Sequence, residues 1–258
     1  MKKDFFCLVY FIIAVLSGYS YSKSPEISII TSLYKGDEFI VGFLNDITHQ
    51  TIFNNCELII INAASPGNEE SIIKKYVKKH DNIIYKKLDY DPGIYAVWNM
   101  AIKMAQGEFI TNANVDDRLA YNCYAIHLDQ LKKAPTVDLV YSDCYMTKVP
   151  NETFEKNNAY KIINRPEFSK KELKKNCLPN NHPMWRKSMH LKYGYFDETY
   201  KIAGDWEMWL RAVKNGSQFV KVPLILSLYY ENPEGLSTDQ NGNWKKEFLR
   251  VYHAYKNI

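Results

Sequence analysis

Hydrophobic and polar positions follow two different periods along the first half of the chain. Short apolar runs, typical of strands buried on both faces, alternate with segments whose apolar residues recur every three or four positions. The runs predict strands at 27–33, 57–61, 82–86 and 108–111, and the periodic segments predict helices after residue 36, at 68–80 and at 93–106. Strands that alternate with helices indicate a mostly parallel, Rossmann-like sheet of the α/β class.

The pattern becomes less regular after about residue 135. The stretch 145–182 looks rich in loops, with one short helix near 169–176. Around it the sequence predicts a strand at 138–142, a helix at 203–215 closed by Asn215-Gly216, strands at 218–222 and 224–230, and a helix at 242–256. We expect a single domain over 23–258 with an irregular second half that sets substrate choice.

The first 22 residues form a separate element. Lys2-Lys3 precede an apolar run from Phe5 to Leu16, and a small-x-small end follows, with Ser20 and Ser22 at the spacing of a cleavage site after Ser22. This is the pattern of a signal peptide, and an uncleaved signal anchor is the alternative, although the run is short for a transmembrane span. We therefore expect a secretory or membrane-associated protein, with membrane association through the N-terminus, and keep the cytoplasmic face as an alternative.

Composition narrows the function only a little. Lysines and arginines number 33 against 29 acids, a small excess that does not suggest a nucleic-acid partner. The cysteines beyond the N-terminal segment are dispersed, and none has the spacing of a zinc site. We expect buried free thiols, with one disulfide as the alternative, at Cys56, Cys123, Cys144 and Cys177.

A cluster of polar residues follows the predicted strand at 108–111. It reads Asn114-Val115-Asp116-Asp117, and ligands of open α/β sheets bind just beyond the carboxyl ends of strands. Mg²⁺ is often shared between one or two carboxylates and the phosphates of a substrate. An Asp-rich turn or a helix cap would produce the same residues, so the cluster alone decides nothing.

Further motifs make the chain similar to a known family. The additional segments are Ile29–Tyr34, Asp91–Ala101, His182–Arg186, Gly194–Glu198 and Ala203–Arg211. In this order and spacing, the chain resembles a family 2 glycosyltransferase of the GT-A fold over nearly all of its length after residue 22. The resemblance implies transfer of a sugar from a nucleotide-diphosphate donor to an acceptor hydroxyl, usually with inversion. It divides the domain into a donor-binding half at 25–120 and an acceptor half at 121–258.

The resemblance also assigns roles to acidic residues. The metal motif of the family appears as Asn114-Val115-Asp116, so Asp116 would face Mn²⁺ or Mg²⁺, and Asn114 would be a weaker oxygen donor or a ribose contact. Asp117 would support that site or cap a following helix. Asp205 aligns with the catalytic base, and the start of a helix favours its ionised form.

Three residues near Asp205 each have two alternative roles. Glu207 is a second candidate base, but its spacing from Arg211 also suits a surface ion pair. Trp206 and Trp209 suit either the core or a sugar platform.

The donor pocket would be built around the ends of the first strands. The resemblance places Thr31, Ser32 and Asn62 against the nucleoside, with Asp91 on a neighbouring loop. It also assigns Asn99 to the donor site and His182 to the diphosphate or acceptor. An Asp-Pro-Gly turn is the structural alternative for Asp91, and a structural role is the alternative for His182.

Departures from the family pattern leave a second function open. The acid usual after the second strand is missing from Asn62-Ala63-Ala64, and Trp98 stands where many relatives have an arginine. We predict an inverting, metal-assisted glycosyltransferase whose acceptor is a glycan, glycolipid or glycoprotein, with lipid-linked acceptors included. The alternative is a non-catalytic sugar- or nucleotide-binding protein that retains the fold.

Overall fold

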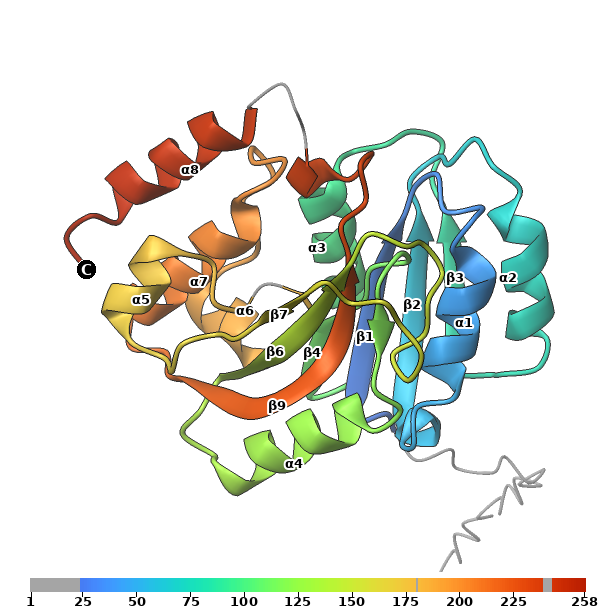
Figure 1. Ribbon diagram of the computed structural model, residues 1–258, viewed down its shortest axis with the longest axis horizontal. Coiled ribbons are helices and arrows are strands. Elements are labelled where there is room, and N and C mark those ends of the chain that lie inside the picture. The colour runs from blue at the N-terminus through green and yellow to red at the C-terminus, as the bar shows by residue number, and fades with distance from the viewer. Residues whose placement is uncertain (1–23, 180, 239–242) are drawn as a thin grey trace, which may run out of the picture.

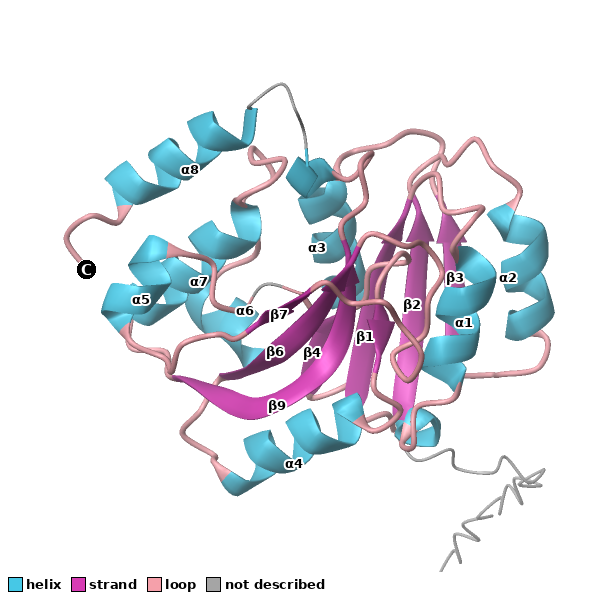
Figure 2. Cartoon of the chain, in the orientation of Figure 1, coloured by secondary structure: helices cyan, strands magenta, loops and turns pink. Residues whose placement is uncertain are grey.

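The computed structural model describes residues 24–179, 181–238 and 243–258, and among these nine strands form one sheet with helices on both faces (Figures 1 and 2). The strands are β1 (Ile27–Leu33), β2 (Cys56–Asn62), β3 (Ile83–Lys87), β4 (Phe109–Asn112), β5 (Arg118–Leu119), β6 (Leu139–Thr147), β7 (Lys161–Ile163), β8 (Met184–Arg186) and β9 (Phe219–Tyr230). Their order in the sheet is β3-β2-β1-β4-β8-β6-β9-β5, and β7 pairs with β6. This confirms the predicted α/β fold with a mostly parallel sheet.

The helices form a layer on each face of that sheet. They are α1 (Ile40–Thr48), α2 (Glu69–Val77), α3 (Ile94–Met104), α4 (Cys123–Lys133), α5 (Lys170–Lys175), α6 (Ser188–Tyr193), α7 (Gly204–Lys214) and α8 (Asn243–Ala254), with the 3₁₀ turns η1 (Phe53–Asn55) and η2 (Leu236–Thr238). Helices α1, α2 and α4 share one core with the sheet, and α3, α5, α6, α7 and α8 share the other. The sequence of β2 is continuously apolar because both faces of the strand are buried. Ile59 and Ile61 pack in one core, and Leu58 and Ile60 pack in the other.

Strand direction decides where a site can form. Strands β1, β2, β3 and β4 are mutually parallel, and the antiparallel β8 separates β4 from β6. Strand β6 therefore points the same way as β4, and β9 is parallel to β6. The carboxyl ends of all six parallel strands, together with the start of β8, meet at one edge of the sheet.

The second half corrects several predicted boundaries. Strand β6 extends to Thr147, and β9 is one strand where two were predicted. Pro223 does not end β9 because the register shifts past Pro223-Leu224, which places the missing N–H in a bulge. The 145–182 stretch holds β7 as well as the predicted α5, and helices α4 and α6 were not predicted.

Two other expectations concern the cysteines and the membrane. Cys56, Cys123 and Cys144 are buried free thiols, and Cys177 is partly exposed. No helix within the described ranges is long and apolar enough to cross a bilayer. The predicted signal peptide or anchor at 1–22 lies outside the described residues.

Candidate active site

Two adjoining cavities open at the carboxyl edge of the sheet. The larger cavity, of about 830 Å³, is bordered by the loops after β1 and β2 and by Asp91, and the smaller cavity, of about 270 Å³, by α3 and the start of α7. The residues common to both are Ser32, Ile94, Asp116, Tyr230, Asn232, Gly235 and Leu236. Asp116 and Asp205, predicted from separate motifs 89 positions apart, both line the smaller cavity.

Asp116 lines both cavities and so lies on the partition between them. Its Oδ2 accepts a hydrogen bond from Nδ2 of Asn232 at 3.0 Å. Burial and the neighbouring Asp117 carboxylate raise the pKa of Asp116 to about 6. A proton or a cation is therefore easily accepted at this carboxylate near neutral pH.

Asp117 fixes the loop that carries Asp116. Its Oδ2 accepts from Nδ2 of Asn114 at 3.0 Å, and its Oδ1 accepts from the backbone N–H of Tyr230 at 3.0 Å. Nε2 of His182 lies 3.2 Å from the same Oδ2. Asp117 is buried and is followed by β5, so it supports the loop that carries Asp116 and does not cap a helix.

Asp205 lies in the first turn of α7 and is held from three sides. The Trp206 N–H donates to its Oδ1 at 2.7 Å, and the Cys177 thiol donates to its Oδ2 at 3.5 Å. The Tyr95 hydroxyl donates to the Ile202 carbonyl at 2.6 Å, and its oxygen lies 3.3 Å from Oδ1 of Asp205. Burial raises the pKa of Asp205 although these hydrogen bonds oppose the shift, so its ionised form is a better proton acceptor than an ordinary aspartate.

The start of α7 is positioned by parts distant in sequence. The Glu247 carboxylate of α8 accepts hydrogen bonds from the backbone N–H groups of Lys201, Ile202 and Ala203 at 2.8–2.9 Å. Gly204 lies against Tyr95, because a Cβ added there would come within 2.7 Å of the tyrosine ring. Helix α8 and α3 thus jointly fix where Asp205 points.

Of the residues expected to hold the donor, three line cavities. Ser32 lines both, Asp91 lines the larger, and Asn114 lines the smaller. Asp91 also forms the expected turn, since its Oδ1 accepts from the Gly93 N–H at 2.8 Å. Both the functional and the structural reading of Asp91 are therefore compatible with its position.

The other four expected donor residues lie behind the cavity walls and line neither cavity. Thr31 is fully buried within β1. The Asn62 side chain binds the Ser65 N–H and the Tyr85 hydroxyl. The Asn99 amide binds both the N–H and the C=O of Phe196, which ties α3 to the loop before α7.

His182 is the fourth of these residues, and its position is compatible with the structural alternative. It is buried with a positive φ of 57°, and its Nδ1 lies 3.2 Å from the carbonyl oxygen of Asn112. With its Nε2 facing Asp117, the ring packs behind the metal motif. Sequence motifs mark such residues without showing on which side of a wall they lie.

The segment 229–236 is the part of the site that sequence reasoning missed. Tyr230, Asn232, Gly235 and Leu236 form the wall shared by both cavities. The signal was a polar turn, Glu231-Asn232-Pro233-Glu234-Gly235, directly after a strand. Because β9 is parallel to β6, this turn reaches the same edge as Asp116, which the sequence pattern did not show.

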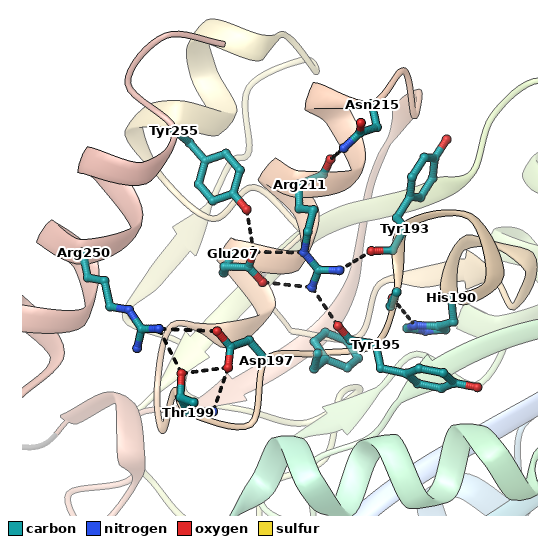
Figure 3. Close-up of polar contacts among 12 residues, drawn as sticks. His190, Tyr193, Tyr195, Asp197, Thr199, Glu207, Arg211, Asn215, Arg250 and Tyr255 are labelled. Carbon is teal, nitrogen blue, oxygen red and sulfur yellow. Dashed lines mark hydrogen bonds and ion pairs between the residues drawn. The ribbon is translucent and has the colours of Figure 1, made fainter.

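Glu207 pairs with Arg211 as predicted, but the pair is not on the surface (Figure 3). Glu207 is only 6% exposed, and both of its oxygens accept from the guanidinium at 3.0 Å. Arg211 also donates to the carbonyl oxygens of Tyr193 and Tyr195, and the Tyr255 hydroxyl donates to Glu207. Glu207 lines neither cavity, which removes it as a candidate base, and Trp206 and Trp209 belong to the core.

A metal at this site would depend on a ligand from outside the chain. Within the described residues, no three His, Cys, Asp or Glu side chains cluster to hold an ion. Among the described residues, the larger cavity is nonetheless lined by Asp37, Glu38, Asp91, Asp116 and Glu234 and by the single cation Lys35. A diphosphate in that cavity would require a counter-cation, and one carboxylate with substrate phosphates is a common environment for Mg²⁺. The donor set therefore fits a metal shared between Asp116 and a bound diphosphate.

A family model for glycosyl transferase family 2 matches residues 28–197. The chain belongs to this family. It is a glycosyltransferase, and the matched region carries β1–β4, Asp116 and most of the cavity walls. Asp205 and the 229–236 segment lie beyond the match.

Known proteins agree with this membership. The chain is 24% identical over 237 residues to WcaA of Escherichia coli K12, a glycosyl transferase provisionally named for colanic acid biosynthesis, covering 91% of this chain and 81% of WcaA. A structure of S. aureus TarS in complex with UDP-GlcNAc matches with a TM-score of 0.71 at 18% identity, covering 89% of this chain and 66% of that one.

A mannosyltransferase of Pyrobaculum calidifontis, in complex with GDP-Man and Mn²⁺, matches with a TM-score of 0.64 at 15% identity and covers 90% of this chain. These similarities confirm the fold. The chain spans slightly less than two thirds of both solved chains.

Proposed function

We propose that this glycosyltransferase moves a sugar from a nucleotide-diphosphate donor to an acceptor hydroxyl with inversion, using Asp116 for a divalent metal and Asp205 as general base. The observation that carries the proposal is the position of the two carboxylates. Asp116 lies on the partition between the cavities, whereas Asp205 lines only the smaller one. The larger cavity would hold the nucleotide and the smaller cavity the acceptor, with the sugar between them.

The proposed reaction divides its work between the two carboxylates. Asp205 removes the proton from the acceptor hydroxyl as that oxygen attacks the anomeric carbon, and the bond from that carbon to the phosphate oxygen breaks. The raised pKa of Asp205 strengthens it as a base, and the Trp206 N–H keeps one of its oxygens in place. A bound Mn²⁺ or Mg²⁺ would neutralise charge that develops on the leaving diphosphate.

Several neighbouring proteins support the donor class. TarS was solved with UDP-GlcNAc, and the Pyrobaculum mannosyltransferase with GDP-Man and Mn²⁺. In this chain residues 25–120 would supply most of the donor site and residues 121–258 most of the acceptor site. The 229–236 wall borders both, so this division is not strict.

The proposal is tested with a panel of UDP- and GDP-sugars, assayed for nucleotide release and transfer with Mn²⁺, Mg²⁺ or EDTA. We expect one donor class to react, EDTA to stop the reaction, and Asp116→Ala and Asp205→Ala each to reduce it by at least about a hundredfold. The matched control is Asp129→Ala, which removes an exposed carboxylate of α4. Full activity in either active-site variant would refute the assigned role, and donor binding without turnover in the unaltered chain would indicate a binding protein.

A further inference from the structure

Helix α8 presents an apolar face to solvent in addition to the face that it buries. Val251 is fully buried, and Phe248 and Tyr255 pack against the core beneath the helix. On the outer side Leu249 is 56% exposed and Tyr252 is 50% exposed. Figure 1 shows this outer side of α8 uncovered by any other described element. Large apolar side chains therefore face outward along one helix.

Basic residues surround these apolar ones. Lys245, Lys246 and Lys256 are exposed. Lys245, Leu249 and Tyr252 recur in α8 at intervals of three or four, and Lys256 lies in the turn directly after the helix. The short helix α5 adds Lys170, Lys171, Lys174 and Lys175. It adjoins α8, because the Lys174 ammonium donates to the carbonyl oxygen of Lys256. We call the outer residues of the two helices the α5–α8 surface.

The acidic residues of α5 and α8 are too few to neutralise this positive charge. Glu247 faces the backbone N–H groups of residues 201–203, and Glu172 pairs with Lys175. Helices α5 and α8 with Lys256 contain eight lysines and arginines and two glutamates, whereas the excess of the entire chain is only four. Arg250 pairs with Asp197 of a neighbouring loop, so the lysines supply the excess positive charge on this side of the molecule.

We propose that the α5–α8 surface docks on an anionic lipid membrane. Helices that lie in a membrane interface combine lysines with outward apolar and aromatic side chains, and each lysine near an anionic leaflet adds to binding. A soluble polyanion would use the lysines but would gain nothing from Leu249 and Tyr252. The joint exposure of both kinds of residue on one helix favours a lipid surface.

The docking would also orient the site. The wall residues Gly235 and Leu236 lie a few residues before α8 in the chain, and Leu236 is 55% exposed. Glu247 of α8 holds the segment directly before Asp205. In Figure 1, α8 lies toward the end of the molecule where the arrows of β1–β3 point, which is the end that carries the cavities. A membrane bound along α8 would therefore lie near the acceptor side of the site.

The test is co-sedimentation of the full chain with vesicles of phosphatidylcholine alone or with about one third phosphatidylglycerol. We expect the unaltered chain to bind the anionic vesicles at least about tenfold more tightly. Lys245→Gln with Lys246→Gln should weaken that binding about twentyfold to thirtyfold, since each lysine contributes about fivefold. Leu249→Ser with Tyr252→Ser should weaken it by at least about tenfold.

The matched control is Lys75→Gln with Lys78→Gln, an equal charge change at exposed positions on α2 and its C-cap, at the opposite side of the molecule (Figure 1). It should bind as the unaltered chain does, and thermal unfolding should show that all variants are folded. Any binding through residues 1–22 is common to every variant and does not affect their ratios. Equal binding to both vesicle types, or equal losses in the control, would overturn the proposal. The proposal would also be overturned if only the lysine variant lost vesicle binding and it lost binding to a soluble polyanion to the same extent.

Discussion

Removing the Glu207 carboxylate should destabilise the protein without abolishing its chemistry. Glu207→Ala leaves the Arg211 guanidinium, whose side chain is 24% exposed, with hydrogen bonds to two backbone carbonyls but without its ion-pair partner (Figure 3). It also removes the acceptor of the Tyr255 hydroxyl, which links α8 to α7. Neither Arg211 nor Tyr255 lines either cavity.

The magnitude follows from burial and geometry. Breaking a fully buried ion pair costs about 3–5 kcal/mol, and the partial exposure of Arg211 reduces this to about 2 kcal/mol. The lost hydrogen bond from Tyr255 adds about 1 kcal/mol. For a domain of this size, a total of about 3 kcal/mol lowers the Tm by roughly 6–12 °C.

Differential scanning calorimetry measures the change, and Asp129→Ala is the control. Asp129 forms an ion pair with Lys133 at the same i,i+4 spacing, but the two side chains are 59% and 71% exposed. Its loss should cost less than about 0.5 kcal/mol. Equal Tm values for the two variants would refute the inference that the Glu207 pair contributes more to stability because it is buried. Loss of transfer activity in folded Glu207→Ala would refute its exclusion as the base.

Three further predictions concern the site. Asp116 has a pKa of about 6, and a proton on this carboxylate competes with a bound metal. The Mn²⁺ concentration for half-maximal activity should therefore rise about tenfold per pH unit below pH 6. A constant concentration from pH 5 to 8 would contradict this. The hydrogen bond from the Cys177 thiol lowers the pKa of Asp205, against the larger upward effect of burial. Cys177→Ala should therefore move the acid limb of the pH profile of kcat/KM to higher pH. An unchanged acid limb would show that the contact is not functional. Gly204→Ala places a Cβ against the Tyr95 ring, so it should lower the free energy of unfolding by about 1–3 kcal/mol and reduce kcat. Unchanged stability and kcat would show that this contact does not fix the ring.

Much of the donor half was predictable because β1 and β2 are almost entirely buried. The apolar runs at β1 and β2 are almost the same length as the strands observed. The second half was harder because its strands are short or edge-exposed, as β7 and β8 are, and because β9 continues through Pro223. There the pairing partners, which no local pattern encodes, decide the structure.

The site shows the same division between local and non-local information. Asp116 and Asp205 are marked by motifs, and both line the smaller cavity. Asn232 and the wall around it depend on β9 running parallel to β6, a long-range feature. Asn62 and Asn99 carry motif positions, yet their amides are used by Ser65 and Phe196 inside the fold. A motif identifies a position, and only packing shows whether its side chain faces substrate.

The central claim is that Asp116 and Asp205 have separate roles at one cavity system. It is tested most directly by measuring donor binding and sugar transfer in Asp205→Asn, with Mn²⁺ present. We predict donor affinity within about threefold of the unaltered chain and transfer reduced by about 10²–10⁴-fold, because a general base is lost while the nucleotide cavity is intact. Transfer at the unaltered rate, or loss of donor binding equal to the loss of transfer, would contradict the claim.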